Sequence, residues 1–77
     1  MIRYRLRERI ADAEFRTGKR VTLTEIQRST GVSQSTLSKL TTRRGYTTTT
    51  DVLDRLCRYF GCELSEIAEY VPDEEVE

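Results

Sequence analysis

Residues 33–44, SQSTLSKLTTRR, bring together the side chains of this 77-residue chain that are best suited to binding a polar partner. Hydroxyls, one carboxamide and three cations occur there beside only two aliphatic residues, Leu37 and Leu40. A carboxamide offers a donor and an acceptor side by side, hydroxyls serve in either role, and the cations attract anions. These residue types therefore predict recognition of an extended, anionic, hydrogen-bonding surface.

Residues suited to catalysis or metal binding are scarce. The chain has no histidine, and its two thiols, Cys57 and Cys62, cannot complete a tetrahedral zinc site. The thiols fit either a disulfide or, as we expect, two small apolar side chains in a reducing compartment. No glycine-rich phosphate loop and no evident pair of catalytic carboxylates occurs either. We therefore expect a protein that is not an enzyme and that needs no metal, cofactor or small-molecule ligand.

The elements that position these side chains are predicted from apolar periodicity and from helix end signals. Leu6, Ile10 and Ala13 define a first helix, and Thr22 with Glu25 forms a capping box for the second. Gly31 then allows a sharp turn before the third. The pattern predicts an all-α fold of five short helices without a competing strand. The expected ranges are 3–15, 22–30, 34–41, 50–60 and 64–70.

Charge is distributed unevenly along the chain, although its net charge is zero. All thirteen Lys and Arg precede Cys62, with six Asp and Glu, whereas residues 63–77 hold the other seven acids and no base. We expect a domain over residues 1–71 followed by an acidic, disordered tail over 72–77. The tail either keeps the protein soluble, or competes for the basic face, or docks on a partner. We expect the arginines of the first helix, Arg3, Arg5, Arg7 and Arg9, to be solvated or paired with Glu8 and Asp12.

Residues 22–41 form two short helices joined by a tight glycine turn, the helix-turn-helix arrangement that places its second helix in the DNA major groove. Base edges and phosphates then become the expected partners of the polar side chains. The residues expected to contact bases are Ser33, Gln34, Ser35, Ser38 and Lys39. The residues expected to contact phosphates are Thr22, Thr24, Arg28, Arg43 and Arg44.

The stretch STGVSQSTLSKL resembles the core of the Cro-type, lambda-repressor-like helix-turn-helix domains of the XRE family, over about residues 3–71. The end, DVLDRLCRYFGCELSEIAEYVPDE, is similar to a small bacterial subgroup of these regulators. The resemblance implies a compact five-helix bundle that binds DNA through residues 33–41. The chain departs from the family at Leu23, where a phosphate-contacting glutamine is usual, and at Gln27, where a small alanine is usual. Gln27 implies either a wider helix crossing or a side chain that is turned outward.

We therefore expect a bacterial or phage-type transcriptional regulator that binds double-stranded DNA. The alternative is a protein-interaction module of the same fold, for example one that binds a toxin or a polymerase subunit. The family implies a dimer, for which the expected last helix offers Ile67, Tyr70 and Val71. The sequence contains no membrane-length apolar run and no signal-peptide pattern, so we expect a cytoplasmic protein.

Overall fold

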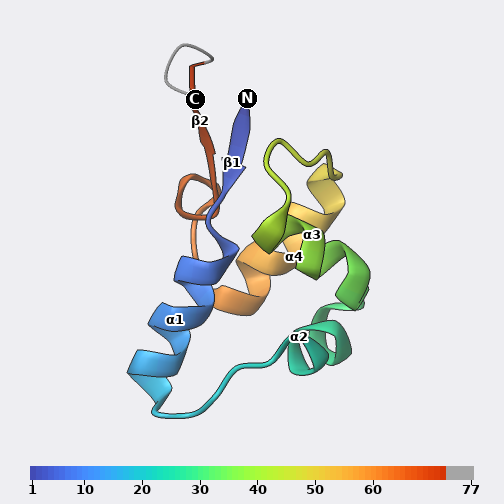
Figure 1. Cartoon of the computed structure of the whole chain (residues 1–77). Coiled ribbons are helices and arrows are strands. Elements are labelled where there is room, and N and C mark those ends of the chain that lie inside the picture. Colours follow the sequence, from blue (N-terminus) through green and yellow to red (C-terminus); the bar gives the residue numbers. More distant parts are fainter. Residues whose placement is uncertain (73–77) are drawn as a thin grey trace.

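The computed structural model describes residues 1–72, which form four α-helices and a small two-stranded sheet (Figure 1). The sheet joins the start of the chain to its end and lies against the helical part. The helices are α1 (Leu6–Thr17), α2 (Leu23–Thr30), α3 (Gln34–Thr42) and α4 (Thr50–Phe60). The remaining elements are strand β1 (Ile2–Tyr4), the 3-10 turn η1 (Leu64–Glu66) and strand β2 (Ala68–Tyr70).

The helices begin and end at the residues that their caps specify. The side chains of Thr22, Ser33 and Thr49 each accept a hydrogen bond from the backbone N–H three residues further on. These bonds satisfy donors that a helix start otherwise leaves open. Gly18 and Gly61 follow α1 and α4 in the left-handed conformation. The predicted starts of α2, α3 and α4 are therefore confirmed.

The prediction of five helices is wrong at both ends of the chain. Residues 2–4 are a strand rather than the start of the first helix, and residues 68–70 are a strand rather than the end of a fifth. The two strands are antiparallel, and Arg3 lies opposite Glu69 in the register. Seven residues are too few for a stable isolated helix, and the strand pairing satisfies their backbone groups instead. Residues 64–66 form only the short turn η1, at whose start the N–H of Glu63 donates to Glu66 Oε1 at 2.9 Å.

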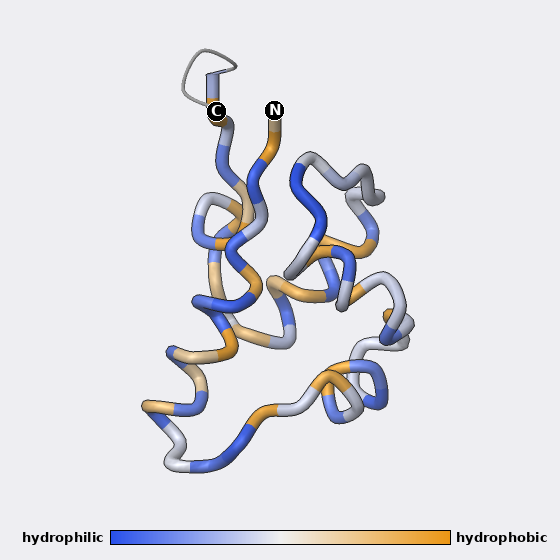
Figure 2. Tube along the Cα trace, in the orientation of Figure 1, coloured by the Kyte–Doolittle hydropathy of each residue, from blue (hydrophilic) through white to orange (hydrophobic). Residues whose placement is uncertain are grey.

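The core lies between the four helices and the sheet. Each of the four α-helices contributes buried apolar side chains, whereas β1, η1 and β2 contribute none. Val32 lies in the turn between α2 and α3, and Ile67 lies between η1 and β2. In Figure 2 the apolar positions recur between hydrophilic ones along each helix, which is the pattern of helices buried on one side. The buried apolar residues are Leu6, Ile26, Val32, Leu37, Leu40, Leu56, Phe60 and Ile67.

The two ends of the domain are joined by backbone hydrogen bonds and an ion pair. The amino group of Met1 donates to the carbonyl of Val71, whose own N–H donates to the carbonyl of Met1, both at 2.8 Å. Arg5 Nη2 lies 2.7 Å from Glu69 Oε2 and donates a hydrogen bond to it. This bond raises the pKa of Arg5 and lowers the pKa of Glu69. The two ends of the domain therefore hold each other in place.

The expected dimer surface is not a helix, and part of it is inaccessible. Ile67 is 0% exposed and belongs to the core, so it cannot contact a second protomer. Tyr70 is 71% exposed but lies on β2, and Val71 is half-buried beside Met1. The prediction that a C-terminal helix with Ile67 forms the dimer contact is therefore wrong, whereas a dimer through Tyr70 and Val71 stays a prediction. The acidic tail lies outside the described residues apart from Pro72.

Within residues 1–72 no helix is both long and apolar enough to cross a lipid bilayer. The same residues contain no cluster of three or more potential metal ligands of the His, Cys, Asp or Glu type.

Candidate nucleic-acid interface

The turn between α2 and α3 is built around Thr30, Gly31 and Val32. Gly31 has a φ of 79°, a left-handed conformation that favours glycine. The buried Thr30 hydroxyl donates to the carbonyl of Ile26 at 2.6 Å and accepts from the N–H of Val32 at 3.1 Å. Arg55 Nη1, from α4, donates to the carbonyl of Thr30 at 2.9 Å. The turn is thus held from both sides, which fixes the angle between the two helices.

Thr30 and Arg55 were not among the predicted site residues. A threonine directly before a turn glycine can return its hydroxyl to the carbonyl four residues back, so the local sequence carries a weak signal for Thr30. No such signal exists for Arg55. It lies 25 residues from Thr30 in the sequence, and only the packing of α4 against α2 brings the two together.

α3 has an inner face that packs and an outer face that is open to solvent. Leu37 and Leu40 are buried, as their spacing predicted. The side chains predicted to contact bases lie away from these two leucines. Ser33, Gln34, Ser35 and Ser38 are exposed and Lys39 is half-buried. The structure therefore brings four of the predicted base-contacting residues onto the outer side of α3, and the fifth, Ser33, is its exposed N-cap.

Gln34 is oriented by a residue of the preceding helix. Its Nε2 donates to Thr24 Oγ1 at 2.9 Å, across an interval of ten residues. A carboxamide whose nitrogen is held in this way presents its oxygen in a fixed direction and keeps one N–H free. This contact links the first turn of α2 to the first turn of α3. Gln34, which is predicted to contact a base, and Thr24, which is predicted to contact a phosphate, are therefore joined by a hydrogen bond.

The serines of α3 differ in how much of their hydrogen-bonding capacity is free. Ser33 Oγ accepts from the N–H of Thr36 at 3.1 Å and donates to Thr36 Oγ1 at 3.0 Å. One acceptor position remains there for a partner. Ser35 and Ser38 make no side-chain hydrogen bond with any of residues 1–72, so both hydroxyls remain available. Ser35 and Ser38 are therefore the better placed of the three to donate to a base.

Lys39 lies beside the loop that follows α3. Its Nζ is 6.0 Å from the centre of the Tyr46 ring, at the outer limit of a cation–π contact. Tyr46 is half-buried and packs on the core. This arrangement holds the Lys39 ammonium near the loop that carries Arg43 and Arg44.

The predicted phosphate-contacting residues lie at three places. Thr22 caps α2 and is half-buried, while Thr24 and Arg28 are exposed and one helical turn apart on α2. Arg43 and Arg44 are exposed and directly follow α3. Arg43 forms no ion pair with any residue from 1 to 72. The two family departures are accommodated as well, because Gln27 is exposed, hence turned outward, and Leu23 packs on the core.

The arginines at the start of the chain contribute to the fold instead of this face. Arg3 pairs with Glu8 at 3.7 Å and with Glu69 at 3.3 Å. Arg5 also pairs with Glu69, and Arg9 pairs with Glu66 at 3.6 Å. Two of these three acidic partners, Glu66 and Glu69, lie far from the arginines in the sequence. The expectation of pairs with neighbouring acids therefore holds only for Arg3 with Glu8.

The two thiols have the properties of packing residues. Cys57 and Cys62 are free and half-buried. Burial raises the pKa of the Cys62 thiol, and the neighbouring Cys57 raises it further. A thiol with a raised pKa stays protonated at neutral pH and is a poor nucleophile and metal ligand.

The fold and the exposed polar helix define a helix-turn-helix domain of the DNA-binding class. A family model of the Cro/C1-type HTH DNA-binding domain matches residues 5–73, nearly the whole chain. The chain therefore belongs to the Cro/C1-type helix-turn-helix DNA-binding domains. No curated protein and no solved structure matches the chain significantly.

Proposed function

We propose that this protein is a sequence-specific regulator of transcription, of the bacterial XRE type, that inserts α3 into the major groove of double-stranded DNA. The observation that carries the proposal is the contact between Gln34 and Thr24, which fixes a carboxamide on the exposed start of α3. A carboxamide in a fixed orientation can make a paired contact to the N6 and N7 atoms of adenine. Residues 1–71 make up the DNA-binding domain.

In this proposal each base-contacting side chain contacts different atoms of the DNA. Gln34 reads adenine, while Ser35 and Ser38 donate or accept at neighbouring base edges. Ser33 offers its remaining acceptor position to a donor such as the amino group of cytosine or adenine. Lys39 reaches a guanine edge or a phosphate near the loop.

The phosphate contacts provide affinity and register without reading sequence. Arg43 and Arg44 grip the backbone beyond the end of α3, and Arg28 does so along α2. Thr22 and Thr24 offer hydroxyls near the start of α2, where the helix dipole favours an anion. With Lys39 included, four cations contact phosphates. A fourfold rise in salt, from 50 to 200 mM, should then weaken binding by about a hundredfold.

Two substitutions test the division into base and phosphate contacts. Gln34→Ala should remove the preference for the base pair that Gln34 contacts. Arg43→Ala should instead weaken binding to all duplexes about equally, and should reduce the slope of log affinity against log salt concentration by about one. Arg16→Ala is the matched control, because Arg16 is an exposed arginine of α1 paired with Asp12. It should leave affinity and preference unchanged. An unaltered preference in Gln34→Ala would contradict the assignment of the reading face.

The salt slope also separates this function from the protein-interaction alternative. A complex with a protein partner, formed through another surface, should depend only weakly on salt and should tolerate Arg43→Ala. Fluorescence anisotropy with labelled duplexes at both salt concentrations provides the measurement.

A further inference from the structure

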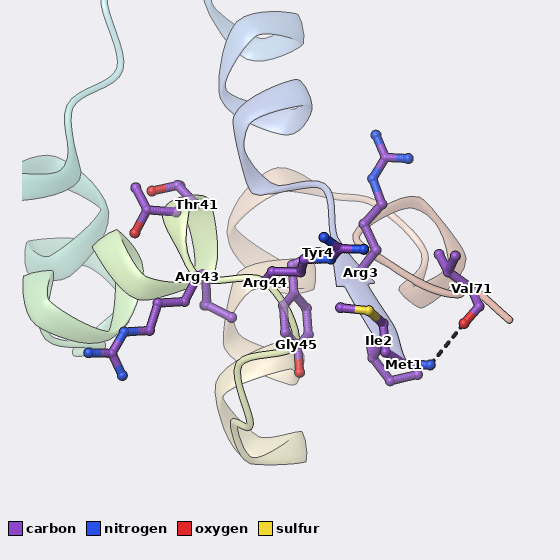
Figure 3. Close-up of a pocket in the computed structure, with 11 residues that line it drawn as sticks. Met1, Ile2, Arg3, Tyr4, Thr41, Arg43, Arg44, Gly45 and Val71 are labelled. Carbon is purple, nitrogen blue, oxygen red and sulfur yellow. Dashed lines mark hydrogen bonds between the residues drawn. The ribbon is translucent and has the colours of Figure 1, made fainter. Parts of the chain in front are cut away.

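A groove of about 320 Å³ separates β1 from the end of α3 (Figure 3). Thr42, the last residue of the helix, borders this groove and is exposed, so β1 does not cover it. The next residue, Arg43, is exposed as well and is directed out of the groove in Figure 3. The last turn of α3 is therefore accessible to a ligand as large as a DNA duplex.

Thr42 lies on the same side of α3 as the two serines whose hydroxyls are available. It follows Ser35 by seven residues, which is close to two full turns, and it follows Ser38 by four residues, which is close to one. Leu37 and Leu40 are buried on the opposite side of the helix. The three exposed residues thus form a row along the outer side of α3, and Thr42 extends this row by one turn beyond Ser38.

The hydroxyl of Thr42 is bonded within the helix. Its Oγ1 donates to the carbonyl of Ser38 at 2.8 Å. A threonine hydroxyl has one hydrogen, so this bond leaves the Thr42 side chain without a donor for a phosphate or for an acceptor on a base. The bond also holds the stiff, β-branched side chain in one rotamer. The methyl group is therefore the part of Thr42 that is left to contact a ligand.

The major groove of DNA offers one apolar group, the C5-methyl of thymine, and a threonine methyl is among the groups that pack against it. Seven residues of α-helix rise by about 10.5 Å, whereas successive base pairs lie about 3.4 Å apart. In a helix that lies along the groove, Thr42 is therefore placed about three base pairs from the base that Ser35 contacts. The other members of the row offer hydroxyls at their positions, so only Thr42 matches a methyl group.

We propose that Thr42 is a specificity-determining residue, which selects thymine by packing its methyl group against the C5-methyl of the base. The inference rests on the proposed function, because it requires α3 in the major groove. It adds one base to those assigned to Gln34 and the serines. The preferred site then contains a T·A pair about three base pairs from the pair that Ser35 contacts.

The test removes the methyl group from either partner, in the duplex motif that the chain selects. In the DNA, each thymine of the motif is replaced in turn by deoxyuridine, which lacks only the C5-methyl. At one position the wild type should bind about threefold to fivefold more weakly, as expected for the loss of one buried methyl group. In the protein, Thr42→Ser removes the methyl and keeps the hydroxyl that bonds to Ser38. This variant should bind the thymine duplex as weakly as the wild type binds the uracil duplex, and should not distinguish the two.

Thr41→Ser is the matched control. The Oγ1 of Thr41 also donates to the carbonyl of Ser38, at 2.7 Å, but Thr41 is half-buried, beside the exposed row. Its variant should keep the wild-type preference for thymine over uracil. The urea midpoints of the two variants should agree, so that a difference in binding does not come from stability.

Three results would overturn the role of Thr42 and leave the proposed function standing. The wild type binds every uracil duplex as tightly as the thymine duplex, or the selected motif contains no thymine, or Thr42→Ser keeps the full preference for thymine. Equal weakening of all duplexes by Thr42→Ser would also overturn it, because that result indicates a phosphate contact. A chain that selects no motif at all would overturn both proposals.

Discussion

Replacing Gly31 by alanine tests whether the turn between α2 and α3 is held as described. A Cβ on Gly31 would lie 3.0 Å from Arg55 Nη1, the atom that donates to the carbonyl of Thr30. The guanidinium must give way, and its hydrogen bond to Thr30, of about 1 kcal/mol, is weakened or lost. The left-handed conformation of residue 31 costs alanine a further 1–2 kcal/mol, roughly. The expected loss in the free energy of unfolding is therefore about 2–3 kcal/mol.

Gly18→Ala is the matched control for this substitution. Gly18 has a φ of 70°, but a Cβ there would have no heavy atom within 4 Å. Gly18→Ala should therefore lower the free energy of unfolding only by the cost of the left-handed conformation, about 1–2 kcal/mol. The difference between the two variants, about 1 kcal/mol, isolates the contact with Arg55.

Urea denaturation followed by circular dichroism measures this difference. For a chain of this size the slope is about 1 kcal/mol per molar urea, so the midpoints of the two variants should differ by about 1 M. In an Arg55→Gln background the gap should close, since the displaced group is then absent. Equal midpoints in the wild-type background would refute the proposed contact between the turn and α4.

Three further predictions concern the reading face and the sheet. Thr24→Val removes the acceptor of Gln34 and should weaken binding to the preferred duplex about threefold to tenfold in anisotropy titrations, with little change in the urea midpoint; unchanged affinity would contradict the orienting role. Ile67→Ala should lower the free energy of unfolding by about 2–5 kcal/mol, whereas Tyr70→Ala should change it by less than about 1 kcal/mol; similar urea midpoints for both would refute the buried position of Ile67. The pKa of Glu69 is lowered by the hydrogen bond from Arg5, so the stability from this pair is present at neutral pH and is lost as the pH falls below about 4.3 towards the folded-state pKa. The urea midpoints of the wild type and Glu69→Gln should therefore converge on acidification; a gap that persists at low pH would contradict this.

The helices could be predicted from the sequence because their signals are local. Thr22 and Ser33 identify two helix starts, Gly31 the turn, and Leu37 and Leu40 the buried side of α3. Each signal lies within four residues of the structure that it specifies. Hydrophobic periodicity then assigns the inner and outer sides of each helix.

The sheet could not be predicted in the same way. Its strands have three residues each, too few for an alternating pattern, and the partner of Arg3 is Glu69, at the other end of the chain. Because the sequence pattern assigns residues 3–15 to one helix, it predicts that the arginines at positions 3, 5, 7 and 9 are solvated or paired with neighbouring acids. In the fold, several of them neutralise acids that the sequence places in the acidic C-terminal part. The orientation of Gln34 by Thr24 was missed for a similar reason, since it depends on the angle between two helices.

The most direct test of the central claim is selection from a pool of randomised duplexes by the purified chain at about 100 mM salt, followed by sequencing of the retained DNA. The proposed function predicts an enriched motif, and Gln34→Ala should lose its preference at one base pair within that motif. Two copies of the motif, centred about 34 Å apart, would show that two protomers bind one site. A retained pool that is still random would contradict sequence-specific recognition by α3.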